Sequence, residues 1–272
     1  MTSLSFSCNG SSLAVGYGKS DHVSWCEHQS VISLWNIFRR DFNRQKPHTS
    51  IDVPNCVTTL EFHPTNPLIL AGGTVNGEIY VWNVDMDESK REGSAVVTKS
   101  EADEYFHREP IKKVVWMLLE SADSFEPEVH LVSISGDGKV LVWKNPLKSL
   151  RYPVKGHLIA RVKERELQIL GGNSISMIKG QGSLEDQAFI VGTEGGMVQR
   201  CLLRRPEYKD VRYFLSNNPN VTWSEEAMNF LGNISDQRQL QKIKDLVDQY
   251  MQQRPPPRQV YANHIFGAKP PI

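Results

Sequence analysis

The chain has 272 residues, of which 39% are hydrophobic and 9% aromatic, and its 31 basic and 31 acidic side chains give a formal net charge of zero at pH 7. This balance excludes the strongly basic surface by which many proteins attract nucleic acid, and no apolar run approaches the ~20 residues of a membrane-spanning helix. We therefore expect a globular protein with neither a nucleic acid nor a membrane as its partner.

A pattern of three short apolar runs recurs four times over residues 1–203. The first run alternates polar and apolar residues, at 4–6, 60–62 and 114–116. The second run is rich in small residues, at 13–16, 69–72, 131–134 and 189–192. The third run lies at 31–36, 78–83, 139–144 and 196–201. Alternation with period two is typical of β-strands that bury one face, so each copy predicts a small antiparallel sheet.

A tryptophan and a turn glycine mark each copy. The third run ends at Trp35, Trp82 and Trp143 in three copies, and Arg200 stands there in the fourth. The second and third runs are separated by Asn76-Gly77, Asp137-Gly138 and Glu194-Gly195, and such pairs supply the positive φ of a two-residue hairpin. In the first copy a longer polar insert, 19–29, replaces the tight turn.

An acidic turn residue in a β-propeller often forms hydrogen bonds within its own blade, and we expect this of Asp137. The candidate structural residues of the repeats are Trp35, Trp82, Trp143, Asp137, Gly77, Gly138 and Gly195.

Three polar segments interrupt the repeats. Residues 85–110 are charged and predict a loop between two repeats, and residues 121–128 predict a long hairpin connection. Residues 144–182 predict two additional strands, at 158–162 and 167–170, before a first strand at 174–178. Three or four strands in a unit of about 40–60 residues are typical of propeller blades and not of helical solenoids. We therefore predict an all-β fold over residues 1–203, a partial propeller of about four blades.

After about residue 203 the pattern changes, and we place a second, helical and proline-rich unit at 204–272. Ser224 can cap a short helix, and Ser235 can cap a longer one that Pro255 terminates. The apolar stripe of the longer helix consists of Leu240, Ile243, Leu246, Val247, Tyr250 and Met251. This stripe predicts packing on the open side of the repeats or binding in a partner's groove; a third alternative is a lone helix of marginal stability.

No combination of residues predicts catalysis. The glycine-rich stretch 72–77 joins two apolar runs and lacks the Lys-Ser/Thr of a phosphate-binding loop. His22, Cys26 and His28 are close in sequence, but their spacing matches no zinc pattern and a fourth ligand is missing. We therefore expect no enzymatic activity, no metal and no cofactor. The chain contains no C-x-x-C pair and its N-terminus lacks a secretory signal pattern, so we expect reduced thiols at Cys8, Cys26, Cys56 and Cys201.

The repeats resemble WD-repeat proteins and, within them, the dynein intermediate chains. Residues 15–18, 21–22 and 31–36 are similar to the start of the propeller in that family. A further set of segments resembles the intermediate-chain subfamily of cytoplasmic dynein 2, namely residues 39–41, 53–54, 62–65, 71–73, 77–82, 135–141 and 191–196. Gly156-His157 also resembles the Gly-His dipeptide that opens many WD repeats. The resemblance covers residues 1 to about 203.

The resemblance implies a non-catalytic subunit whose propeller binds the dynein heavy chain and other dynein subunits. It implies a role in retrograde intraflagellar transport and cilium assembly. The expected location is the cytoplasm, the cytoskeleton and the cilium, at the axoneme or basal body.

The chain departs from this family in two respects. It begins at the first blade, so the segment that recruits light chains is absent and light-chain binding is not expected. It also leaves the family pattern after about Leu203. Four blades of a ring of about seven leave two open edges, so we expect an open arc that is marginally stable alone. Two alternatives stay open: a WD-repeat scaffold of another complex such as axonemal dynein, and a truncated form without independent function.

Overall fold

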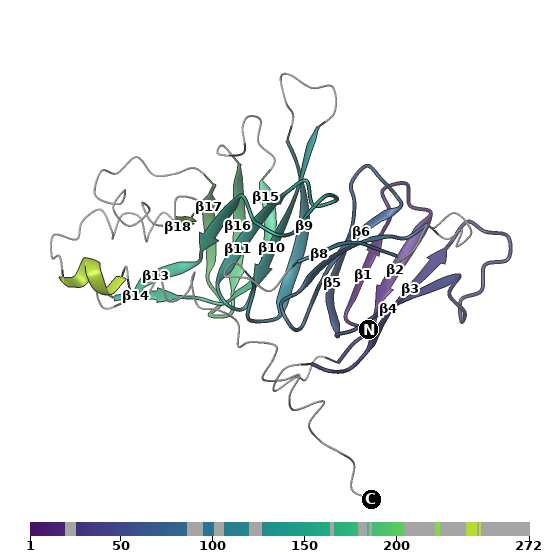
Figure 1. Ribbon diagram of the computed structural model, residues 1–272, viewed down its shortest axis with the longest axis horizontal. Helices are drawn as coiled ribbons and strands as arrows, with labels where there is room; N and C mark the ends of the chain where they lie inside the picture. Colours follow the sequence, from purple (N-terminus) through teal and green to yellow (C-terminus); the bar gives the residue numbers. More distant parts are fainter. Residues whose placement is uncertain are drawn as a thin grey trace, which may run out of the picture.

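β-Strands dominate the fold (Figure 1). The computed structural model describes residues 1–19, 26–85, 95–100, 106–119, 127–163, 166–178, 184, 187–203, 221–223, 238–243 and 245. The α-helical residues among these are 238–243 and 245. Within this part of the chain, no helix is long and apolar enough to cross a membrane.

Four antiparallel sheets follow one another along the chain. The first contains β1 (Ser3–Phe6), β2 (Ser12–Gly16), β3 (Ser30–Asn36) and β4 (Thr49–Val53). The second contains β5 (Val57–Phe62), β6 (Ile69–Thr74), β7 (Ile79–Asn83) and β8 (Val96–Lys99). The third contains β9 (Ile111–Leu119), β10 (Glu128–Ser135), β11 (Lys139–Lys144) and β12 (Lys155–Leu158). The fourth contains β15 (Gly172–Ile178), β16 (Ala188–Thr193) and β17 (Val198–Leu202).

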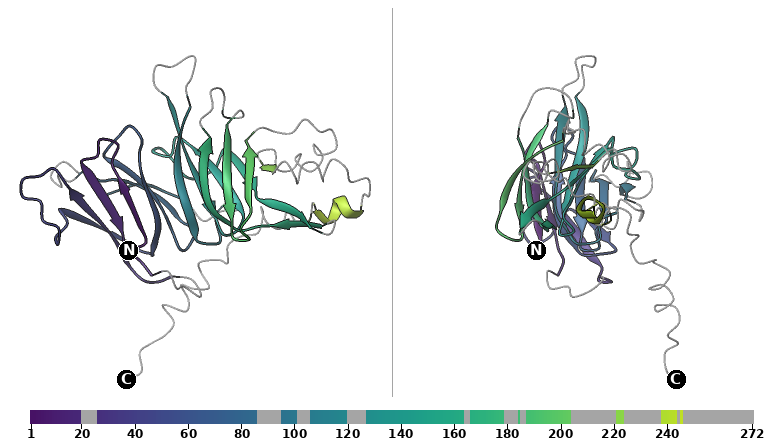
Figure 2. Two further views of the ribbon diagram at one scale, coloured as in Figure 1. Left: turned by 180° about the vertical axis from the view of Figure 1, so that it is seen from behind. Right: turned by 90° about the vertical axis from the view of Figure 1, so that its left-hand side faces the viewer.

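These sheets are the blades of a propeller, numbered 1 to 4 in chain order. Their first strands β1, β5, β9 and β15 lie side by side in that order. Blade 1 lies at one end of the long axis of the molecule, and blades 3 and 4 lie beyond blade 2 toward the other end, so the blades form an open arc (Figures 1 and 2). The predicted all-β fold, a partial propeller of about four blades, is confirmed.

Apolar layers between neighbouring blades form the core. The layer between blades 1 and 2 includes Ala14, Ile32, Leu34, Leu60 and Phe62. The layer between blades 2 and 3 includes Ala71, Ile79, Val81, Leu141 and Trp143. The layer between blades 3 and 4 includes Val132, Val140, Phe189, Val191 and Cys201. Each inner blade therefore has an incoming face, which packs on the preceding blade, and an outgoing face, which packs on the following one. Burial of one large apolar side chain is worth about 1.5–3 kcal/mol, so these layers hold the arc together.

The turns between the second and third strands of blades 2, 3 and 4 differ from the predicted two-residue hairpins. Only the third residue of each loop has a positive φ, at Gly77 (φ 78), Gly138 (φ 78) and Gly196 (φ 75). The amide of Gly77 donates to Thr74 O at 3.2 Å, and Thr74 N donates to Glu78 O at 2.9 Å. This is the three-residue loop in which a left-handed glycine closes a type I turn. Gly195 is therefore one residue away from the position that requires glycine, and Gly196 occupies that position. The register also corrects the expected place of Arg200: Cys201, which pairs with Phe189 as Trp143 pairs with Leu131, has the tryptophan position, and Arg200 has the position of Val142.

The turn glycine also provides room for the next blade. A Cβ on Gly77 would lie 2.1 Å from the carbonyl oxygen of His107, in the segment that leads into blade 3. A Cβ on Gly138 would lie 2.7 Å from Leu170 O, in the segment that leads into blade 4. Gly196 lies in the turn between β16 and β17 of blade 4, and a Cβ there would meet nothing within 4 Å in the described part of the chain.

We expect Gly196→Ala to lower the free energy of unfolding by about 1 kcal/mol, because only the positive φ is penalised. The same substitution at Gly77 should cost about 2 kcal/mol, because the methyl group also pushes against a backbone carbonyl. Chemical denaturation of the two variants measures the difference. Equal losses would show that the contact between blades adds nothing to the turn.

The segments between repeats contain strands that the sequence pattern did not indicate. Residues 85–110, expected as a loop, contain β8, the outer strand of blade 2, with residues 86–94 and 101–105 outside the described part. Lys99 in β8 forms an ion pair with buried Glu78 at 2.9 Å, which explains why a polar strand docks there. The two additional strands expected within 144–182 are β13 (Ala160–Lys163) and β14 (Glu166–Ile169). β12, also in this segment, was not expected.

The C-terminal unit is described only in part. β18 (Val221–Trp223) pairs in parallel with β12 and so adds a strand to blade 3, which the pattern did not indicate. The short helix expected after Ser224 lies outside the described residues, as do the stripe positions from 246 onward. In the described helix Ile243 is buried, and the helix lies near the β13–β14 hairpin (Figures 1 and 2).

All four cysteines are free thiols, three of them buried and Cys8 exposed.

Candidate functional site

A buried hydrogen-bond network centres on Asp137, in the turn between β10 and β11. Its carboxylate accepts from the backbone amides of Lys139 and Arg108, both at 3.0 Å. It also lies 3.2 Å from His107 Nδ1. On the other side of the imidazole, Nε2 lies 2.9 Å from Ser133 Oγ, which accepts from Trp143 Nε1 at 3.0 Å. The network therefore joins the turn, two strands of blade 3 and the segment that leads into the blade.

Charge as well as hydrogen bonding holds Asp137. Burial alone raises the pKa of its carboxyl, but His107, Lys139 and the amide of Arg108 outweigh burial and lower the pKa to about 2. Lys139 Nζ lies 3.7 Å from the second carboxylate oxygen and is itself buried. Asp137 is thus a charged anchor inside the blade and not a group that exchanges protons near neutral pH.

The sequence pattern did not indicate His107. The Gly-His resemblance pointed to His157, which lies in β12 with its ring edge-on to Phe189 at 5.2 Å between centroids. Burial lowers the pKa of His157 to about 3. The imidazole that completes the network comes from the charged segment 85–110, where Phe106 and His107 are the two adjacent buried residues before β9. An aromatic residue and a histidine shortly before a strand form a local pattern that could have indicated His107 from the sequence.

The equivalent tryptophans of blades 1 and 2 lack such a network. Among the described residues, Trp35 Nε1 and Trp82 Nε1 are buried without a hydrogen-bond partner. The position of Ser133 is filled by Val15 in blade 1 and by Gly72 in blade 2, as the strand registers show. A Cβ on Gly72 would lie 2.8 Å from the Trp82 ring and 2.7 Å from Thr59 O, so blade 2 has no room for a serine.

Blade 2 uses a different anchor at its turn. Asn76, the counterpart of Asp137, accepts from Cys26 N at 2.8 Å and donates to Cys26 O at 2.9 Å. Glu78 is buried and binds Lys99, Asn55 and the hydroxyl of Tyr80. The turn of blade 2 therefore holds the insert of blade 1 in place. This insert contains Cys26 and His28, two of the three residues that were considered as zinc ligands from the sequence. His22 of that hypothesis lies outside the described residues, and no group of three or more metal-ligating side chains occurs within them.

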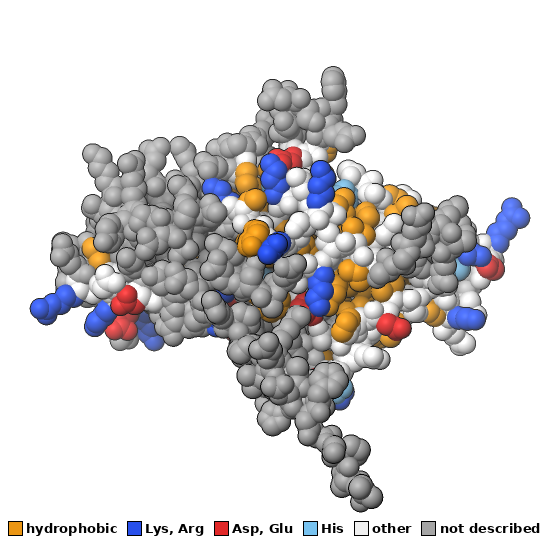
Figure 3. All heavy atoms as spheres, in the orientation of Figure 1, with side chains coloured by type: hydrophobic (Ala, Val, Ile, Leu, Met, Phe, Trp, Pro, Cys, Tyr) orange, Lys and Arg blue, Asp and Glu red, His pale blue; other side chains and the backbone are white. Residues whose placement is uncertain are grey.

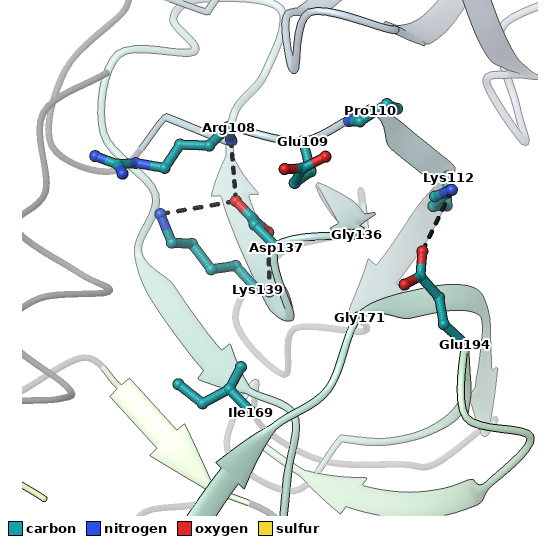
Figure 4. A pocket seen from close by; sticks show the side chains of 10 residues that line it. All are labelled: Arg108, Glu109, Pro110, Lys112, Gly136, Asp137, Lys139, Ile169, Gly171 and Glu194. Atoms are coloured by element: carbon teal, nitrogen blue, oxygen red, sulfur yellow. Dashed lines mark hydrogen bonds and ion pairs between the residues drawn. The ribbon is translucent and has the colours of Figure 1, made fainter. Parts of the chain in front are cut away.

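An open cleft lies beside the Asp137 turn, between blades 3 and 4 (Figure 4). Its volume is about 590 Å³. Charged side chains of both signs line it, from the segment before β9, from the first residues of β9 and β11 and from the turns of blades 3 and 4: Arg108, Glu109, Lys112, Asp137, Lys139 and Glu194. Lys112 and Glu194 face each other across it at 3.5 Å and are 33% and 53% exposed. The cleft thus combines a buried carboxylate that its network holds in place with exposed charges of both signs.

Comparison with known proteins agrees with this architecture. The family model for the WD domain, G-beta repeat, matches residues 45–83, which include β4 to β7. Human cytoplasmic dynein 2 intermediate chain 2 is 32% identical over 217 residues, 76% of this chain and 38% of the relative. Human dynein axonemal intermediate chain 2 is 31% identical over 160 residues, 58% of this chain and 23% of the relative.

A more distant relative is dynein axonemal intermediate chain 4 of Danio rerio, 25% identical over 217 residues, 78% of this chain and 26% of the relative. The chain spans less than two fifths of the length of these relatives. The chain thus contains a match to the WD repeat within a partial propeller and is similar in sequence to dynein intermediate chains.

Proposed function

We propose that this protein is a non-catalytic, intermediate-chain-type subunit of a dynein complex. It binds the dynein heavy chain and supports retrograde intraflagellar transport and cilium assembly, and it resides in the cytoplasm, the cytoskeleton and the cilium. The observation that carries this proposal is the similarity to cytoplasmic dynein 2 intermediate chain 2, which extends over 76% of the chain. Propellers present turns and rims to their partners, and such a role requires no catalytic group.

The charged cleft between blades 3 and 4 is the contact that we assign to the heavy chain. Its exposed charges come from two blades, so a partner that binds there contacts both blades, and its binding depends on their relative position. Charges at the rim of an interface mainly set the register and the association rate, and this suits the alternating signs of Lys112, Glu109 and Glu194. The buried Asp137 network fixes the turn that forms one wall of the cleft.

Binding to purified heavy-chain tails tests the proposal. The full chain is expected to retain the tail of the cytoplasmic dynein 2 heavy chain in a pull-down, and to retain an axonemal heavy-chain tail less well. Retention of neither tail would refute the proposed function. Preference for the axonemal tail would favour the second candidate, a scaffold of axonemal dynein, which the 31% identity to an axonemal intermediate chain supports.

Lys112→Glu is expected to weaken binding to the heavy-chain tail about 3–10-fold, because it reverses a rim charge and breaks the pair with Glu194. The loss should shrink as the salt concentration rises, because exposed charges are screened. Isothermal titration at two ionic strengths measures both effects. Lys144→Glu is the matched control: Lys144 is an exposed lysine paired with Glu128, away from the cleft. Equal losses in both variants would remove the cleft as the contact.

A further inference from the structure

Two cysteines from different blades lie beside each other at the junction of blades 1 and 2. Cys26 belongs to the insert of blade 1, and Cys56 directly precedes β5, the first strand of blade 2. Both thiols donate to one acceptor, the carbonyl oxygen of His28, at 3.7 Å from Cys26 Sγ and 4.0 Å from Cys56 Sγ. Burial raises the pKa of the Cys56 thiol, and the Cys26 thiol raises it further, so the two sulfur atoms are close neighbours.

Adjacent residues of a single turn hold the backbones of both cysteines. The turn between β6 and β7 binds Cys56 through Val75 N, which donates to Cys56 O at 2.9 Å. The side chain of Asn76 binds Cys26, accepting from its amide at 2.8 Å and donating to its carbonyl oxygen at 2.9 Å. The position of each cysteine relative to the other is therefore set by hydrogen bonds to the backbone of both.

A cleft at the junction leads to one of the two thiols. Its volume is about 360 Å³, and its wall includes Tyr17, Lys19, His28 and Cys56. Cys56 is only 1% exposed, and the amide of Lys19 donates to its sulfur at 3.4 Å. Cys26 is also 1% exposed but does not line the cleft. A small reagent that enters the cleft therefore meets the sulfur of Cys56 before that of Cys26.

We propose that Cys26 and Cys56 are a modification site, at which a disulfide of low molecular mass, such as glutathione disulfide, converts them to an intrachain disulfide. The Cys56 thiolate attacks one sulfur of the reagent, whose S–S bond breaks and releases one thiolate. The Cys26 thiolate then attacks the Cys56 sulfur of the mixed disulfide and releases the second thiolate. Two electrons pass from the protein thiols to the reagent, and the two protons of the protein thiols end on the two thiols released.

The cross-link adds a covalent tie to a junction that packing and hydrogen bonds hold together. The first strands β1 and β5 meet there, and Ser3 Oγ and Ser5 Oγ accept from the amides of Leu60 and Phe62 at 2.9 Å. Hydrophobic side chains are visible at the surface over the region of β1 and β5 (Figure 3). The disulfide closes the chain from residue 26 to residue 56, which includes β3 and β4. Oxidation is therefore expected to raise the midpoint of thermal unfolding by about 5–10 °C.

Incubation of the reduced full chain with glutathione disulfide, followed by alkylation and peptide mapping by mass spectrometry, tests the proposal. The expected product is a linked pair of peptides that contain Cys26 and Cys56. It should form over minutes to hours, because a buried thiol with a raised pKa reacts slowly. Cys8→Ser, which removes the exposed thiol, and Cys201→Ser, which removes a buried thiol in the layer between blades 3 and 4, are the matched controls and should keep the link.

Serine variants of the pair test the order of attack. Cys26→Ser is expected to accumulate a mixed disulfide of glutathione on Cys56, whereas Cys56→Ser should leave Cys26 unmodified. In neither variant should the reagent raise the unfolding midpoint, while dithiothreitol should return the oxidised wild type to its original midpoint. The proposal is overturned if Cys26 and Cys56 both remain open to alkylation after the native chain has been treated, if either is linked to another cysteine instead, or if the link forms only in denaturant.

Discussion

Asp137→Ala is expected to lower the free energy of unfolding by about 3–5 kcal/mol, since removing one member of a buried charge pair leaves the others unsatisfied. The substitution removes the acceptor of two backbone amides and the partner of His107 and Lys139. Asp137, His107 and Lys139 are at most 9% exposed, so most of the lost contacts lie inside blade 3 or at its entrance. The segment before β9 would then lose its attachment to the turn.

Thermal and chemical unfolding of Asp137→Ala, Asp137→Asn and Asp41→Asn checks this expectation. Asparagine keeps one acceptor oxygen, so Asp137→Asn should lose less stability than the alanine variant. Asp41 is the matched control, because it pairs with Arg39 on an exposed loop, and its substitution should leave the unfolding midpoint unchanged. A loss below about 1 kcal/mol for Asp137→Ala, the range of an ordinary hydrogen bond, would contradict the role of the network.

The strands and the four repeats were predictable because they depend on local patterns. Alternation over four to seven residues, a glycine after a polar residue and a terminal tryptophan lie within one short window, and β2, β3, β6, β7, β10 and β11 fall where these signals predict. The turn type was not predictable to the residue. In the fourth repeat Gly195 and Gly196 are adjacent, and only the hydrogen-bond register shows that Gly196 has the positive φ.

The network and the cleft depend on contacts that no local pattern records. His107 precedes Ser133 by 26 residues and Asp137 by 30, so three short segments must be brought together before the imidazole has a role. β8 presents a similar difficulty. Its four residues are flanked by charged sequence. The strand docks on β7 through the ion pair between Lys99 and Glu78, which lies in the turn just before β7. Glu78 itself is buried, which composition alone would not suggest for an acidic residue.

The turn glycines and the Asp137 network couple neighbouring blades. Each turn positions the segment that starts the next blade: Gly77 closes on His107 and Gly138 closes on Leu170. The stability of one blade therefore depends on the next. In the fourth blade a Cβ built on Gly196 meets nothing within 4 Å in the described part of the chain, and Val198 beside it is 74% exposed.

The protein is expected to lose stability as the pH falls from about 6.5 towards 4. Burial lowers the pKa of His157 from 6.5 to about 3. Between pH 6.5 and pH 3, His157 is therefore protonated in the unfolded chain and neutral in the folded chain. The contribution of neutral His157 is fully present above pH 6.5 and decreases as the pH falls towards 3. At 1.36 kcal/mol per pKa unit, about 3 kcal/mol is lost by pH 4. Burial also lowers the pKa values of His63 and His130, which add to the loss in the same direction.

Replacing His157 by glutamine separates this residue from the other histidines, because the amide is polar but does not titrate. The variant should be less stable than the wild type at pH 7, since the edge contact with Phe189 is lost, yet its unfolding free energy should fall less steeply between pH 6.5 and 4. Asp137 does not interfere in this window, because its carboxyl has a pKa of about 2 and its contribution is lost only below about pH 4. Phe38→Gln on an exposed loop is the control and should leave the slope unchanged, because neither side chain titrates. Parallel pH profiles for the wild type and His157→Gln would mean that β12 opens far enough to hydrate the ring, and would contradict a closed layer between blades 3 and 4.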